Sequence, residues 1–197
     1  HILSPMPYLM SLGVNSKATA MSILARLNVN GQAISLSKEY LSTKTAMNAG
    51  AMKDVIAARK AAGKKITMAM TFPGGTHDLW LRYWLAAGGI DPDQDVGLIT
   101  IPPPQMVANM KADTMDAFCV GEPWPDQLVA QGLGYTAVST GQMWMNHPEK
   151  SFAMRSDWIA AHPKAAVAIT AAVLEAQRWA DNPANISRLA MMISGRD

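Results

Sequence analysis

A glycine-rich turn that leads into hydroxyl and imidazole side chains is the most informative pattern in the chain. Residues 72–89 read FPGGTHDLWLRYWLAAGG and follow the apolar run Ile66–Met70. The glycine pair that ends at Gly75 leaves backbone N–H groups uncovered, and the dipole of the helix that follows adds partial positive charge there. Thr76, which is placed to cap this helix, and His77 add two side-chain donors. The segment therefore predicts a small-anion site at the start of a helix.

This turn matches neither of the common nucleotide-binding motifs. It lacks the Gly-Lys-Ser/Thr ending of a Walker phosphate loop and the three-glycine spacing of a dinucleotide fingerprint. The simplest alternative is an ordinary turn before a helix, with His77 as a surface or cap residue. The anion interpretation therefore depends on which other residues reach the same place.

Three further positions supply groups that a bound anion would need. Gly121 lets a backbone N–H approach a ligand closely, and Lys150 carries the positive charge that a monovalent anion requires. Gln32, at an expected helix start, could donate an amide N–H. Gly75 and Trp124 are candidates for the pocket wall. Each has an ordinary alternative: a turn glycine, a solvated lysine, an exposed glutamine or a packing tryptophan.

The sequence carries no recognisable catalytic motif. His77 and Asp78 are adjacent, so on a helix their side chains point in different directions and cannot form a dyad. Glu122 could act as a base, but no serine stands in a nucleophile elbow and no metal triad or cofactor fingerprint is present. We therefore expect a binding protein without cofactor or metal rather than an enzyme.

Composition excludes several other classes of protein. The chain has 197 residues, of which 49% are hydrophobic and 16% charged, enough for a packed core. A formal net charge of +2 without a basic run disfavours nucleic acid as a partner. No apolar run approaches the roughly 20 residues that span a bilayer. The single cysteine, Cys119, lies in an apolar run and is expected in the core.

Short apolar segments alternate with helical patterns, which is typical of an α/β fold with largely parallel sheets. Strands are expected at 21–25, 66–72, 96–101, 116–120, 135–139 and 151–155. Helices are expected from Ser4-Pro5, at 32–41, 46–62, 76–87, 105–112, 124–131 and 157–161, from Pro163 to about residue 180, and from Pro183.

The order of these elements indicates one lobe inserted into another. We expect residues 1–65 and 148–197 to build the first lobe and residues 66–147 to form the inserted second lobe. The loops that follow parallel strands converge at one edge of a sheet. A ligand would then bind in the cleft between the lobes.

Three segments resemble a known family: FPGGTHDLWLRYWLAAGG, PPPQMVANMKADTMDAFCVGEPW and NHPEKSFAMRSDW. They are similar to the nitrate-binding proteins of cyanobacterial-type ABC transporters, whose close relatives bind bicarbonate. The similarity covers nearly the whole chain. It implies a two-lobed periplasmic-binding-protein-like fold of type II, which closes on its anion and delivers it to permease subunits.

The resemblance also implies the residues of the site. The anion would be contacted by Thr76, His77, the backbone of Gly121, Gln32 and Lys150. In the bicarbonate binders, the position that matches Lys150 is occupied by an acidic residue. This residue works together with a bound metal ion. The lysine therefore favours nitrate, or nitrite, and a site without metal.

The chain departs from that family in its length, because the opening of the first lobe, with its first strand and a site tryptophan, is not in the sequence. We expect a periplasmic protein, associated with the membrane only through an N-terminal anchor outside the sequence. Three alternatives stay open: a bicarbonate-binding homologue, a cytoplasmic nitrate sensor of the same fold, and an enzyme of cofactor-precursor biosynthesis built on it.

Overall fold

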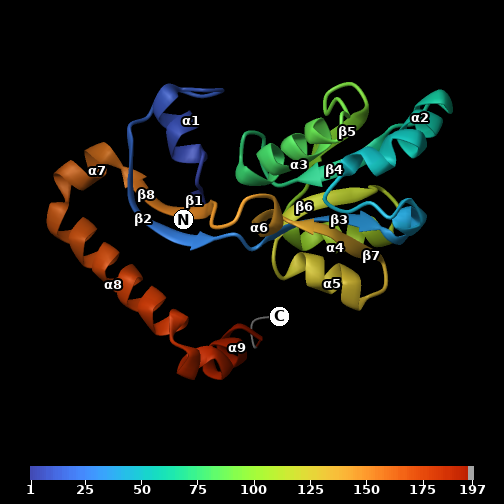
Figure 1. The fold of residues 1–197 in the computed structure, drawn as a ribbon. Helices are drawn as coiled ribbons and strands as arrows, with labels where there is room; N and C mark the ends of the chain where they lie inside the picture. The colour runs from blue at the N-terminus through green and yellow to red at the C-terminus, as the bar shows by residue number, and fades with distance from the viewer. Residues whose placement is uncertain (195–197) are drawn as a thin grey trace. The chain divides into compact units, whose positions relative to one another are not determined.

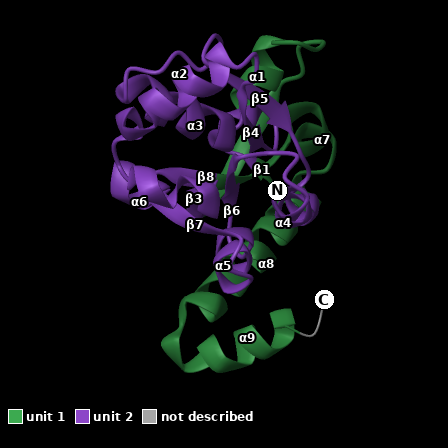
Figure 2. Cartoon of the chain, turned by 90° about the vertical axis from the view of Figure 1, so that its right-hand side faces the viewer, with its two compact units in different colours: residues 1–2, 7–27, 150–197 green, residues 3–6, 28–149 purple. Residues whose placement is uncertain are grey.

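The computed structural model describes residues 1–194, and the chain divides into two compact units (Figure 2). The first unit contains residues 1–2, 7–27 and those from Lys150 onward, and the second contains residues 3–6 and 28–149. Among the described residues, no helix has the length and apolar character needed to cross a membrane.

The second unit is built on a five-stranded mixed sheet (Figure 1). Its strands, in spatial order, are β5 (Val96–Thr100), β4 (Ile66–Met70), β6 (Ala117–Gly121), β3 (Gln32–Ser37) and β7 (Gly134–Ser139). Strand β4 runs parallel to both β5 and β6, whereas β3 runs antiparallel to both β6 and β7. The α/β class is confirmed, but the expected largely parallel sheet is corrected to a mixed one.

Strand β3 occupies a segment for which the sequence predicted a helix at 32–41. All six residues of the strand are buried. Ile34 and Leu36 point into one core cluster, while the Ser35 hydroxyl lies 3.5 Å from that of Thr136 on β7. The helix prediction was wrong because a short apolar run does not reveal its period, and pairing with two neighbouring strands decides its conformation.

Helices cover both faces of this sheet (Figure 1). Helix α3 (Thr76–Ala87) has the predicted bounds and packs Leu81, Trp84 and Leu85 into one cluster. The predicted helix 46–62 is a 3-10 turn, η2 (Ala49–Met52), followed by α2 (Lys53–Ala61). The other face is covered by α4 (Pro103–Lys111) and α5 (Trp124–Ala130). A 3-10 helix, η1 (Lys38–Thr43), and a single-turn helix, α6 (Thr140–Met143), complete the unit.

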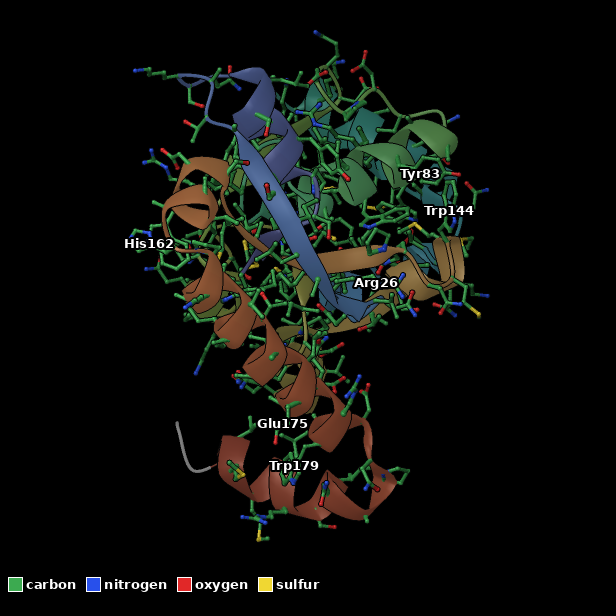
Figure 3. The ribbon with its side chains drawn as sticks, turned by 90° about the vertical axis from the view of Figure 1, so that its left-hand side faces the viewer. Arg26, Tyr83, Trp144, His162, Glu175 and Trp179 are labelled. Atoms are coloured by element: carbon green, nitrogen blue, oxygen red, sulfur yellow. The ribbon has the colours of Figure 1, made fainter. Side chains whose placement is uncertain are left out.

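The other sheet has three strands in the order β1 (Ile2–Leu3), β8 (Pro148–Arg155) and β2 (Met21–Val29). The remaining helical elements of the described residues are α1 (Met6–Leu12), α7 (Ser156–Ala161), α8 (Pro163–Asp181), the 3-10 turn η3 (Pro183–Asn185) and α9 (Ile186–Ser194). The Gln177 side chain on α8 donates to the carbonyls of Arg26 and Leu27, which ties the helix to β2. At the α7–α8 junction the His162 ring stacks on Trp158, and Glu175 and Trp179 lie further along α8 (Figure 3).

The compact units differ from the sequence-based division at residues 28–65, and at residues 148–149, which belong to the second unit. Residues 28–65 belong to the second unit as well, whereas the sequence analysis placed residues 1–65 in one lobe. The difference at residues 28–65 follows from β3, which is hydrogen-bonded on both sides within the five-stranded sheet. Residues 3–6 also belong to the second unit, where the Ser4 N–H donates to the Glu149 carbonyl at 3.0 Å.

Candidate functional site

Four polar side chains meet in the interior of the second unit, and we call them the polar cluster: Gln32, Thr76, His77 and Glu149. Gln32 begins β3, Thr76 and His77 begin α3, and Glu149 lies near the start of β8. Their residues are only 1%, 5%, 3% and 2% exposed, respectively. Buried polar groups are costly unless they are hydrogen-bonded, so such a cluster requires either internal partners or a ligand.

The sheet explains how Gln32 reaches the start of α3. Parallel strands β4 and β6 end at the same edge, and α3 begins a short turn after β4. Strand β3 runs the opposite way, so its first residue lies at that edge, with Gln32 opposite Gly121. The carboxyl ends of parallel strands are where α/β proteins bind ligands.

The turn before α3 explains why the Thr76 hydroxyl is available to the cluster. Gly74 adopts a φ of +75°, which suits glycine, and its N–H donates to the Asp78 carboxylate at 2.8 Å. The cap residue of α3 is Gly75 rather than Thr76, which is the first residue of the helix. The expected capping role of Thr76 is therefore corrected, and its side chain bonds to Gln32 and Glu149 instead.

The hydrogen bonds of the polar cluster converge on one carboxylate oxygen. Gln32 Nε2 donates to Thr76 Oγ1 at 2.7 Å and to Glu149 Oε2. Thr76 Oγ1 donates to the same Oε2 at 2.7 Å. His77 Nε2 lies 3.7 Å from Glu149 Oε1, and its Nδ1 bonds to the Thr71 hydroxyl. Gln32 Oε1 is buried without a hydrogen-bond partner among residues 1–194.

A second layer of buried groups holds the backbone of Gln32. The Thr140 hydroxyl donates to the Gln32 carbonyl at 3.2 Å and bonds to His147 Nε2 at 2.7 Å. The His147 ring packs against Trp80 of α3 with centroids 4.7 Å apart. Thr140 is fully buried and His147 is 5% exposed. This layer links the start of β3 to α3 and holds the backbone of Gln32.

The remaining predicted residues have different surroundings. Gly121 is partly buried opposite Gln32, and a Cβ there would lie 3.5 Å from the Gly31 carbonyl. Trp124 is partly buried and packs on the core cluster beneath α4 and α5. A Cβ on Gly75 would lie 2.5 Å from the Leu3 side chain. Their proposed contacts with an anion stay predictions.

The structure groups three of the five predicted contact residues by direct hydrogen bonds or close approach: Gln32, Thr76 and His77. Lys150 is partly buried and belongs to the first unit, so its role in the site also stays a prediction. Sequence reasoning missed Glu149, which directly precedes Lys150 in NHPEKSFAMRSDW. Complementarity to an anion predicts donors and a cation, not an acid. Its signal was its place beside Lys150 in a segment that resembles the family.

Electrostatics around the cluster keep the cysteine neutral. Burial raises the pKa of the Cys119 thiol far above its ordinary value, and the negative charges of Glu149 and Asp78 raise it further. The residue is fully buried in a core cluster, which agrees with the expected core role. Within the part of the chain that the structure describes, no group of three or more His, Cys, Asp or Glu side chains could hold a metal ion.

Comparison with known proteins gives consistent matches over the whole chain. The model of the NMT1-like family matches residues 1–194. The nitrate/nitrite binding protein NrtA of Nostoc sp. strain PCC 7120 is 56% identical over 196 residues, covering 100% of this chain and 44% of that protein. The bicarbonate-binding protein CmpA of Synechococcus elongatus is 39% identical over 196 residues, covering 98% of this chain and 44% of that protein.

A solved structure shows the same fold. The crystal structure of the periplasmic nitrate-binding protein NrtA from Synechocystis PCC 6803 superposes with a TM-score of 0.92 at 52% identity, covering 100% of this chain and 50% of that one. The predicted periplasmic-binding-protein-like α/β fold is thereby confirmed. The chain spans less than half the length of the curated relatives described above.

Proposed function

Because this chain belongs to the NMT1-like family, we propose that it acts in a solute-binding component that captures nitrate, and also nitrite, for an ABC importer. The observation that carries the proposal is the meeting of Gln32, Thr76 and His77 in one buried place at the start of α3. The names of the relatives support a binding rather than a catalytic role.

The chemistry of these groups suits nitrate. Nitrate is planar and monovalent, keeps its charge at any physiological pH and offers only acceptors. An amide, a hydroxyl and an imidazole offer donors, and the N-terminus of α3 adds partial positive charge. Gly121 adds a backbone N–H at the same edge of the sheet in this proposal, while Gly75 and Trp124 wall the pocket.

Lys150 supplies the positive charge in this proposal. A buried monovalent anion needs a compensating cation, and a lysine favours an anion that carries no proton. The higher identity to NrtA than to CmpA, 56% against 39%, supports nitrate over bicarbonate. We further propose that the protein works in the periplasm and delivers its anion to permease subunits.

Calorimetric titration of the chain with nitrate, nitrite and bicarbonate, with and without divalent metal, tests the proposal. Metal-independent binding of nitrate supports it, and metal-dependent binding of bicarbonate alone overturns it. Lys150→Glu should abolish nitrate binding, whereas Lys164→Glu on the exposed side of α8 should not. Equal affinity of the Lys150 variant and the unchanged chain would remove Lys150 from the site.

One observation favours bicarbonate as a second candidate ligand. Glu149 places a buried carboxylate beside the donors, and a carboxylate can accept a hydrogen bond from the hydroxyl of bicarbonate but not from nitrate. The same titration separates the two ligands, because each is added alone.

A further inference from the structure

Two of the side chains predicted to donate to the anion, Gln32 and Thr76, already donate within the chain. Gln32 Nε2 has two N–H groups, of which one points to Thr76 Oγ1 and the other to Glu149 Oε2. The single hydroxyl proton of Thr76 also goes to Glu149 Oε2. An oxyanion that binds the Thr76 hydroxyl must therefore take a proton that Glu149 now accepts, and one that binds both N–H groups of Gln32 must take a second.

The position of Glu149 is fixed by its backbone and by burial. Its carbonyl accepts the Ser4 N–H at 3.0 Å, and only 2% of the residue is exposed. Its other carboxylate oxygen lies 3.7 Å from His77 Nε2. The carboxylate therefore faces three of the four side chains that the anion would contact: Gln32, Thr76 and His77.

A carboxylate and a small oxyanion make the same demands on these donors. A carboxylate and nitrate are both planar, delocalise one negative charge over oxygen atoms and offer acceptors only. Two like charges in one buried place repel each other strongly, because little water screens them. Gln32 Oε1 has no hydrogen-bond partner among residues 1–194. The orientation of the amide is therefore set by the bonds that its Nε2 donates to Glu149 and Thr76.

We propose that the Glu149 carboxylate is an internal acceptor that competes with the bound oxyanion for the donors of Gln32 and Thr76, and so sets the affinity of the site. The inference rests on the proposed function, since it assumes that an oxyanion binds there. Glu149 limits affinity: a weaker internal acceptor leaves the donors more available to the ligand.

The test compares nitrate binding by the unchanged 197-residue chain and by Glu149→Gln, which keeps the shape of the side chain and removes its charge. We expect the variant to bind nitrate about tenfold or more tightly in calorimetry. Glu39→Gln removes an exposed carboxylate that pairs with Arg59 in the same unit and should change affinity by less than about twofold. Unchanged or weaker binding by Glu149→Gln, with nitrate still bound by the unchanged chain, overturns the inference and leaves the proposed function intact.

A second readout follows the Gln32 amide directly, first without ligand and then with nitrate. The side-chain amide resonances of Gln32 in ¹⁵N NMR spectra should move on Glu149→Gln substitution, because the amide loses a charged acceptor. In the unchanged chain, the same resonances should also move on saturation with nitrate. This second comparison remains available if the variant does not fold. If neither protein binds nitrate, the proposed function fails. If, in addition, the Gln32 resonances do not move on substitution, Glu149 is not the acceptor of this amide and the inference fails separately. Stationary Gln32 resonances during calorimetrically verified binding overturn the competition.

Discussion

Gln32 and Gly121 lie opposite each other on the antiparallel strands β3 and β6. The pairing is extended by the Glu122 N–H, which donates to the Gly31 carbonyl at 3.0 Å. As a result, Gln32 at the start of β3 lies beside the end of β6. That edge is also where α3 begins after β4, so donors from distant parts of the sequence reach one place.

Replacement of Thr76 by valine tests the hydroxyl in the polar cluster. The variant keeps the shape of the side chain but loses one hydrogen bond, worth about 1–1.5 kcal/mol. We expect nitrate affinity to fall about tenfold in calorimetric titration. Thr136→Val, at an exposed position on β7, is the matched control. Equal affinities of the two variants would contradict a role for Thr76 in binding.

Thr140 should matter for stability, because its fully buried hydroxyl joins the Gln32 carbonyl to His147. Thr140→Val leaves both groups without this partner in the interior, and such a loss typically costs about 1–3 kcal/mol. Urea denaturation followed by circular dichroism should show the corresponding fall in the free energy of unfolding. Thr100→Val is the control, because this exposed hydroxyl on β5 contacts a weak acceptor, Met70 Sδ, at 3.6 Å. It should stay within about 0.5 kcal/mol of the unchanged chain; a similar result for Thr140→Val would show that the link is dispensable.

Gly88 should not tolerate a methyl group. A Cβ at this position would lie 2.5 Å from the Gly50 nitrogen and 2.7 Å from the Ala49 Cβ, where the end of α3 packs on η2. We expect Gly88→Ala to lose about 1–3 kcal/mol in thermal or chemical unfolding. Gly97→Ala is the control, because the nearest atom to its Cβ is 3.9 Å away. If both variants have the same stability, the close contact does not limit packing here.

The Cys119 thiol should resist alkylation in the folded chain. Burial, with the charges of Glu149 and Asp78, raises its pKa, so the thiolate that attacks iodoacetamide is scarce at about pH 8. Unfolding returns the pKa to about 8.5 and exposes the sulfur. Mass spectrometry should therefore find labelling only in denaturant, and rapid labelling of the native chain would contradict the burial.

The sequence was sufficient where local signals agree. Helix α3 was predicted with its observed bounds, Thr76–Ala87, because glycines flank a clear helical period. Strand β4 was predicted from its apolar run and observed at Ile66–Met70. Both elements depend on residues that are close in sequence.

Strand β3 and Glu149 could not be found in the same way. The conformation of residues 32–37 depends on pairing with β6 and β7, which lie far along the chain. Glu149 meets Gln32 and Thr76 across separations of 117 and 73 residues. Complementarity to an anion does not predict an acid, although the folded chain places one among the donors.

The long separations within the polar cluster also determine the order in which its members appear during synthesis. Thr76 precedes Glu149 by 73 residues, which at about 5–20 residues per second corresponds to roughly 4–15 seconds of translation. Over that interval Gln32 and Thr76 have been made and their internal acceptor has not.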